Sequence, residues 1–110
     1  MAIAEVSIVP LGTGSTSVSR YVAGVHQLLA ETSENIRYQL TPMGTILEGE
    51  LDDLLAVIRR MHEVPFGQGA GRVYTTIKID DRRDKPSTME SKVQSVEEKL
   101  RQSGREGRRG

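Results

Sequence analysis

The sequence predicts one α+β domain, in which four short strands and two amphipathic helices are followed by a third helix. Three observations support this prediction. The chain has 110 residues, the usual size of a single domain. Its apolar residues recur with period two in some segments and with period 3.6 in others. Residues that favour turns, mainly Gly, Pro, Ser and Thr, separate these segments.

The first segments predict a strand, a loop and a helix. Residues 2–9 alternate between apolar and polar, as in a half-buried strand, and Pro10 is expected to end it. A loop rich in Gly and hydroxyl groups follows, and its Thr16 or Ser17 can cap the next helix. That helix should end near Ser33. It carries one apolar stripe: Val18, Tyr21, Val22, Val25, Leu28 and Leu29.

The middle of the chain predicts a β-hairpin and a second helix. Residues 36–40 and 45–49 alternate on either side of a turn at residues 41–44. The second helix begins near Leu51, with two Asp residues in its first turn, and residues 66–71 form its glycine-rich exit. Its apolar stripe consists of Leu51, Leu54, Leu55, Ile58 and Met61.

The last part predicts a strand, a third helix and a tail. Residues 73–80 alternate as a fourth strand. Ser87 stands three residues before Glu90, a capping box that begins a helix with the stripe Met89, Val93, Val96 and Leu100. The helix is expected to stop at Gly104. We therefore predict one domain over residues 1–104 and a disordered basic tail over residues 105–110.

The order of these elements predicts the ferredoxin-like fold, a βαββαβ sandwich with an antiparallel four-stranded sheet, plus an added C-terminal helix. Right-handed crossovers place both main helices on one face of the sheet. The residues expected to meet them are Ala4, Val6, Ile8, Ile36, Tyr38, Leu40, Leu47, Val73, Thr75, Ile77 and Ile79. The opposite face mixes polar residues with Val9, Ile46 and Tyr74, so it suits a ligand surface or a subunit interface.

Composition excludes several classes of function. Fifteen basic side chains balance fifteen acidic ones, which gives no broad positive field for nucleic acid. Without cysteine there is no disulfide, thiolate metal site or cysteine nucleophile. No apolar run is long enough to span a membrane, and the first residues lack the basic start of a signal peptide. We expect a cytoplasmic protein that binds neither membranes nor nucleic acid.

Several motifs, in order, resemble a known family. They are PLGT at residues 10–13, SVS at 17–19, MGTILEGE at 43–50, RVYTTIKIDDRRD at 72–84 and Lys92-Val93. Together they resemble the small thiamine-binding protein family related to YkoF, over about residues 5–100. The resemblance implies a ferredoxin-like subunit, tetramers formed through sheet faces, and binding of thiamine or its hydroxymethylpyrimidine part. It implies no catalysis.

Glu48 is the first candidate for contact with such a ligand. An aminopyrimidine presents an amine beside a ring nitrogen, and a carboxyl group can meet both with two hydrogen bonds. The structural alternative is an ion pair with Lys78 or Arg37 on the same face. Glu5, on the first strand, is the second candidate. Ile46, Leu47 and Met43 are expected to supply apolar walls.

Hydroxyl and amide side chains complete the predicted site. The expected ligand-binding residues are Glu5, Ser7, Ser17, Ser19, Gln39, Thr41, Thr45, Glu48 and Thr76. Residues 15–19 can bind an anion at the start of the first helix, although simple capping is the competing role. The stretch 12–17 is neither a Walker A loop nor a dinucleotide fingerprint, because it lacks the required Lys and the third Gly.

No enzyme, metal site or cofactor is expected. His26 and His62 each lack a second ligand four residues away, so a metal or a catalytic histidine is disfavoured. The sequence predicts a non-enzymatic homotetramer that binds thiamine or a related pyrimidine. The alternative is a regulatory or scaffolding homo-oligomer whose polar sheet face is only an interface.

Overall fold

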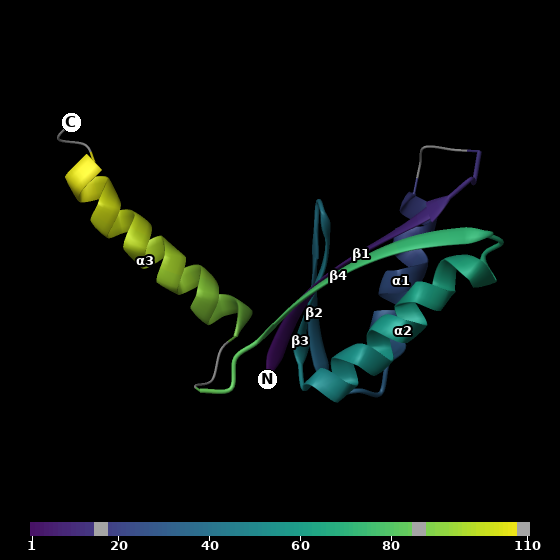
Figure 1. Cartoon of the computed structure of the whole chain (residues 1–110), viewed down its shortest axis with the longest axis horizontal. Coiled ribbons are helices and arrows are strands. Elements are labelled where there is room, and N and C mark those ends of the chain that lie inside the picture. The colour runs from purple at the N-terminus through teal and green to yellow at the C-terminus, as the bar shows by residue number, and fades with distance from the viewer. Residues whose placement is uncertain (15–17, 85–87, 108–110) are drawn as a thin grey trace.

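The computed structural model describes residues 1–14, 18–84 and 88–107. Its elements, in chain order, are β1 (Ala2–Leu11), α1 (Ser19–Glu31), β2 (Ile36–Thr41), β3 (Gly44–Gly49), α2 (Leu51–Gly67), β4 (Arg72–Asp81) and α3 (Met89–Gly107). The strands form one antiparallel sheet in the order β2-β3-β1-β4. Helices α1 and α2 lie side by side on one face of this sheet (Figure 1). The predicted ferredoxin-like fold with an added helix is confirmed.

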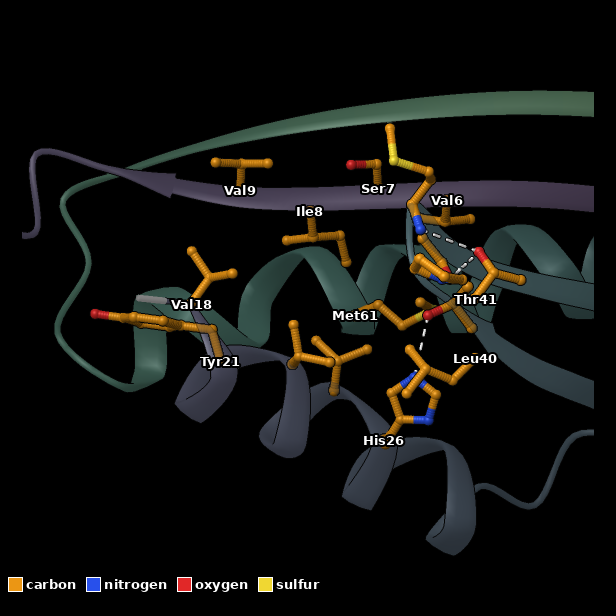
Figure 2. A pocket seen from close by; sticks show the side chains of 16 residues that line it. Val6, Ser7, Ile8, Val9, Val18, Tyr21, His26, Leu40, Thr41 and Met61 are labelled. Atoms are coloured by element: carbon orange, nitrogen blue, oxygen red, sulfur yellow. Dashed lines mark hydrogen bonds between the residues drawn. The ribbon is translucent and has the colours of Figure 1, made fainter. Parts of the chain in front are cut away.

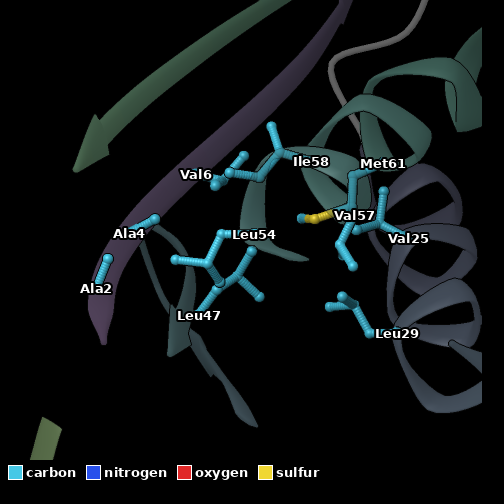
Figure 3. Packing of buried hydrophobic residues seen from close by; sticks show 10 residues of the cluster. All are labelled: Ala2, Ala4, Val6, Val25, Leu29, Leu47, Leu54, Val57, Ile58 and Met61. Carbon is cyan, nitrogen blue, oxygen red and sulfur yellow. The ribbon is translucent and has the colours of Figure 1, made fainter. Parts of the chain in front are cut away.

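The core lies between the two central strands and the helix pair (Figure 3). Its buried residues are Ala2, Ala4, Val6, Val25, Leu29, Leu47, Leu54, Val57, Ile58 and Met61. The prediction that the whole apolar sheet face meets the helices is wrong at the edges. Tyr38 and Leu40 on β2, and Ile77 and Ile79 on β4, are 40–56% exposed. Helix α2 contacts β1, β4 and β3, whereas α1 contacts mainly α2, so the edge strands β2 and β4 are only partly covered.

Pairing along β1 is unequal on its two sides. Its ladder to β4 runs from Ala2 to Leu11, whereas its ladder to β3 ends where Val6 faces Thr45. The prediction that Pro10 ends the strand is wrong, because Pro10 lies inside β1 opposite Val73. A missing backbone N–H is tolerated there, since this part of β1 has a partner on one side only.

Two helix ends differ from the prediction. Val18 occupies the N-cap of α1 without a side-chain hydrogen bond, and α1 ends at Glu31 instead of near Ser33. The proposed caps Thr16, Ser17 and Ser87 lie outside the described residues.

At α3, Thr88 and Ser91 exchange side-chain to backbone hydrogen bonds, which is a capping arrangement one residue later than predicted. This helix continues through Gly104 to Gly107, so the predicted stop at Gly104 is wrong. One glycine in an exposed helix costs about 1 kcal/mol relative to alanine, which does not suffice to end it.

The β2–β3 turn is held by Thr41 and by a close backbone approach at Gly44. The Thr41 hydroxyl donates to the Gly44 carbonyl at 2.9 Å and accepts from the Met43 N–H at 3.3 Å. A Cβ added to Gly44 would lie 2.7 Å from the Val6 carbonyl oxygen. Glycine at this position therefore allows the hairpin to meet β1 at the last pair of their ladder.

Replacement of Gly44 tests this close approach. Gly44→Ala should lower the free energy of unfolding by about 1–3 kcal/mol, because the new methyl group overlaps a backbone atom that cannot move aside. Chemical denaturation measures the change. The control is Gly71→Ala, where no atom lies within 4 Å of the added Cβ and the expected change is within about 0.5 kcal/mol. Equal stability of the two variants would contradict the packing described.

Candidate functional site

A pocket of about 260 Å³ opens beside the unpaired edge of β1. It lies between the first three turns of α1, residues 6–9 of β1 and the β2–β3 turn. In Figure 2, Ile8 faces Tyr21 and Met61 across the space, whereas Ser7 and Val9 project from the other side of β1. Sixteen of the described residues line the pocket, and none of these is Asp, Glu, Lys or Arg. The pocket is therefore mainly apolar and carries no formal charge from Asp, Glu, Lys or Arg.

Polar groups in the lining fall into two kinds. The Thr41 hydroxyl is used by the turn, where it both donates and accepts. The Thr45 hydroxyl instead contacts a side chain of α1, because its Oγ1 lies 3.1 Å from Nε2 of His26. Thr45 is 5% exposed, and the His26 ring also meets the Tyr38 ring edge-on at 5.8 Å. The Thr45–His26 pair is thus a partly buried polar contact in an apolar wall.

His26, Tyr21 and Ile8 are not among the ligand-binding residues predicted from the sequence. His26 is one residue away from the apolar stripe of α1, which left it without an assigned partner. The short β2–β3 turn could have indicated this contact, because it places Thr45 close to α1. That contact depends on where the β1–β3 ladder ends, and sequence periodicity does not specify this position.

The opposite face of the sheet carries a second polar arrangement. One row across all four strands consists of Arg37 on β2, Glu48 on β3, Ile3 on β1 and Asp80 on β4. The first turns of α3 are attached to both ends of this row. Arg37 pairs with Glu90, and Lys92 pairs with Asp80.

Glu48 is the most buried charged residue of this row. Its side chain has no exposed surface, and Oε2 accepts from Nη1 of Arg37 at 3.1 Å. Its other oxygen, Oε1, has no hydrogen-bond partner among the described residues. Arg37 also donates to Glu90, which holds the pKa of Glu90 below its usual range and raises that of Arg37. The predicted alternative, an ion pair between Glu48 and Arg37, is therefore present.

The predicted site residues do not form one cluster. Ser7, Thr41 and Thr45 line the pocket, as does Met43 among the predicted walls. Glu5, Gln39, Glu48 and Thr76 lie on the opposite sheet face, where Glu5 pairs with Lys78 at 3.8 Å. Ile46 also lies on that face, and Leu47 belongs to the core.

Ser19 begins α1 and is exposed, whereas Ser17 lies outside the described residues. Among the residues that the structure describes, no three His, Asp or Glu side chains are grouped as metal ligands would be. None of the described helices has the length and apolar character needed to cross a membrane.

Comparison with known proteins was made against families, sequences and structures. The family model described as thiamine-binding protein matches residues 4–97. Protein YqgV of Bacillus subtilis is 56% identical over 102 residues, which cover 91% of this chain and 98% of that protein. A protein of Methanothermobacter thermautotrophicus is 48% identical over 101 residues, covering 91% and 100% of the two chains.

A solved structure gives the same result for the fold. The crystal structure of protein MJ1052 from Methanocaldococcus jannaschii superposes with a TM-score of 0.77 at 37% identity, covering 88% of this chain and 96% of that one. By residue range, the match to the family model extends through the sheet, both main helices and the first part of α3, as far as residue 97. The chain belongs to the thiamine-binding protein family.

Proposed function

We propose that this protein binds thiamine or a related hydroxymethylpyrimidine compound, without catalysing a reaction, in the cytoplasm. The observation that carries the proposal is the uncharged pocket beside β1, with the Thr45–His26 pair in its wall. An apolar cavity with a few convergent polar groups is the usual form of a small-molecule site. Membership of the thiamine-binding family supplies the class of ligand.

The size and chemistry of the pocket suit a single substituted ring. Its volume of about 260 Å³ lies near the lower end of ligand pockets, which span roughly 300–1,000 Å³. The aromatic faces of pyrimidine and of Tyr21 can pack together, and Met61 and Ile8 offer apolar contact. The amine of the pyrimidine requires a hydrogen-bond acceptor, which the Thr45 hydroxyl can supply.

Glu48 is the rival location for the amine edge. The unpartnered Oε1 would suit a donor from the ligand. However, the side chain has no exposed surface and already pairs with Arg37, so a ligand could reach it only after Arg37 and the start of α3 move. The pocket requires no such movement, and for this reason we place the ligand there.

Filling the pocket tests this location. Val22→Phe adds a ring to the pocket wall on α1 and should weaken thiamine binding at least tenfold, as measured by titration calorimetry. Ala23→Phe adds a ring to the exposed side of the same helix and is the matched control, expected to bind as the wild type does. Binding unaffected by Val22→Phe would exclude the pocket.

Glu48→Gln distinguishes the rival location. If the ligand lies in the pocket, this variant should bind thiamine with wild-type affinity, because Glu48 does not line the pocket. If Glu48 holds the amine edge, the loss of one charged acceptor should cost roughly thirtyfold or more in affinity. The same calorimetric titration measures both outcomes, and a circular dichroism melt checks that the variant is folded.

A specific observation also favours the second candidate, a regulatory or scaffolding homo-oligomer. Val93, Val96 and Leu100 on α3 are 55–63% exposed, and Tyr74 is exposed on the open sheet face. Apolar groups gathered on one helix stripe are typical of a surface that another subunit covers. We propose a homotetramer, which is compatible with either function.

Light scattering tests the assembly. At micromolar concentration the wild type should have four times the 12.1 kDa mass of the chain. Val96→Asp places a charge in the exposed stripe of α3 and should lower that mass, because an unpaired buried charge is costly. Ser95→Asp adds the same charge beside the stripe and should leave the mass unchanged. A wild type that is monomeric at every concentration would contradict the proposal.

A further inference from the structure

The Thr45 hydroxyl has an unusual place among the polar groups of the pocket. The Thr41 hydroxyl holds the backbone of the turn, and the Ser7 side chain projects from the other side of β1 (Figure 2). Thr45 Oγ1, by contrast, faces Nε2 of His26 at 3.1 Å. This leaves part of its hydrogen-bonding capacity unused, because a hydroxyl offers one donor and two acceptor sites.

The tautomer of His26 sets the direction of this hydrogen bond. Thr45 is 5% exposed, so its hydroxyl hydrogen must meet an acceptor within the protein or remain unsatisfied at a considerable cost. His26 Nε2 is the partner that the structure gives it. With Thr45 as donor and Nε2 as acceptor, the proton of a neutral His26 lies on Nδ1. The His26 ring is only half-buried, so an Nδ1–H can reach water.

This direction determines what Thr45 offers to a bound ring. While its hydrogen points to His26, the lone pairs of Oγ1 are available to an amine on the ligand. When His26 is protonated, Nε2 becomes a donor, and the Thr45 hydrogen must turn toward the pocket. The same hydroxyl then suits a carbonyl or an unprotonated ring nitrogen.

We propose that His26 is a positioning residue that sets whether Thr45 accepts a hydrogen bond from the ligand or donates one. The proposal rests on the pyrimidine-binding function and adds its selectivity. While His26 is neutral, the protein should bind a ring with an amine beside the Thr45 hydroxyl more tightly than the corresponding oxo ring. His26 acts through Thr45 and needs no contact with the ligand.

The groups around His26 are compatible with this role. Thr45 of β3 and the edge-on Tyr38 ring of β2 are its described contacts from the sheet. Within the pocket lining, Tyr21 is the other side chain with an ionisable group, and its hydroxyl accepts a hydrogen bond from Arg20 at 3.0 Å. Protonation of His26 at Nε2 is the change within the pocket lining that would reverse the hydrogen-bonding role of Thr45.

Calorimetry with two probes tests the proposal. These are 4-amino-5-hydroxymethyl-2-methylpyrimidine and its 4-oxo counterpart, each titrated into the full chain at pH 6 and pH 8. Affinity for the amino compound should be about fivefold to tenfold higher at pH 8 than at pH 6, as expected for one hydrogen bond. Affinity for the oxo compound should change in the opposite direction.

Three variants isolate the source of this pH dependence. His26→Gln cannot titrate and should abolish the opposite response of the two probes, leaving only any titration of the ligand itself. Thr45→Val keeps the shape but removes the hydroxyl, so it should weaken the amino compound and also abolish the response. His62→Gln is the matched control, because His62 forms a similar bond to Thr75, at 2.7 Å, away from the pocket lining. It should retain the wild-type profile.

Nitrogen NMR of the ligand-free protein gives an independent measurement. The neutral His26 ring should carry its proton on Nδ1, and a proton on Nε2 would overturn the inference. An opposite pH response that persists in His26→Gln would overturn it as well. If the wild type binds both probes without the predicted response, the inference fails and the proposed function stands. If it binds neither probe nor thiamine, the proposed function fails and the inference fails with it.

Discussion

The end of the β1–β3 ladder at Val6 and Thr45 is the constraint on which the pocket depends. The hairpin turns back at Gly44, so β3 is shorter than β1, and residues 7–11 keep a partner only on the β4 side. This one-sided pairing admits Pro10 and leaves space between β1 and α1. A longer hairpin would extend β3 into that space and close the pocket. The candidate site in this protein therefore depends on where a strand stops.

The two histidines show how one type of contact can serve two purposes. Each joins a helix to the sheet through a threonine hydroxyl, His26 to Thr45 and His62 to Thr75. His62 packs edge-on against Phe66 of its own helix, outside the pocket lining, and its bond fixes α2 on β4. His26 also fixes a helix, but its threonine borders a cavity. The chemical difference between the two lies in the surroundings of the threonine.

Much of the fold could be predicted from the sequence, because strand and helix periodicities differ clearly over residues 2–9, 51–61 and 73–80. The assignment of side chains to the two sheet faces could be predicted as well, because side chains alternate strictly along a β-strand. The site could be predicted only in part. Thr45 and Glu48 were both candidates, yet an odd separation along β3 places them on opposite faces, and the resemblance alone does not say which face holds a ligand. The contact of His26 with Thr45 could not be predicted, because it depends on where the β1–β3 ladder ends.

The attachment of α3 to the sheet is sensitive to salt. Its first turns meet the row of Arg37, Glu48, Ile3 and Asp80 through ion pairs of partly exposed side chains, Arg37 with Glu90 and Lys92 with Asp80. Beyond this point α3 extends away from the sheet (Figure 1). Exposed ion pairs are screened as the Debye length falls from about 10 Å at 0.1 M salt to about 3 Å at 1 M. High salt should therefore weaken the attachment of α3 more than it weakens the apolar core between the sheet and α1–α2.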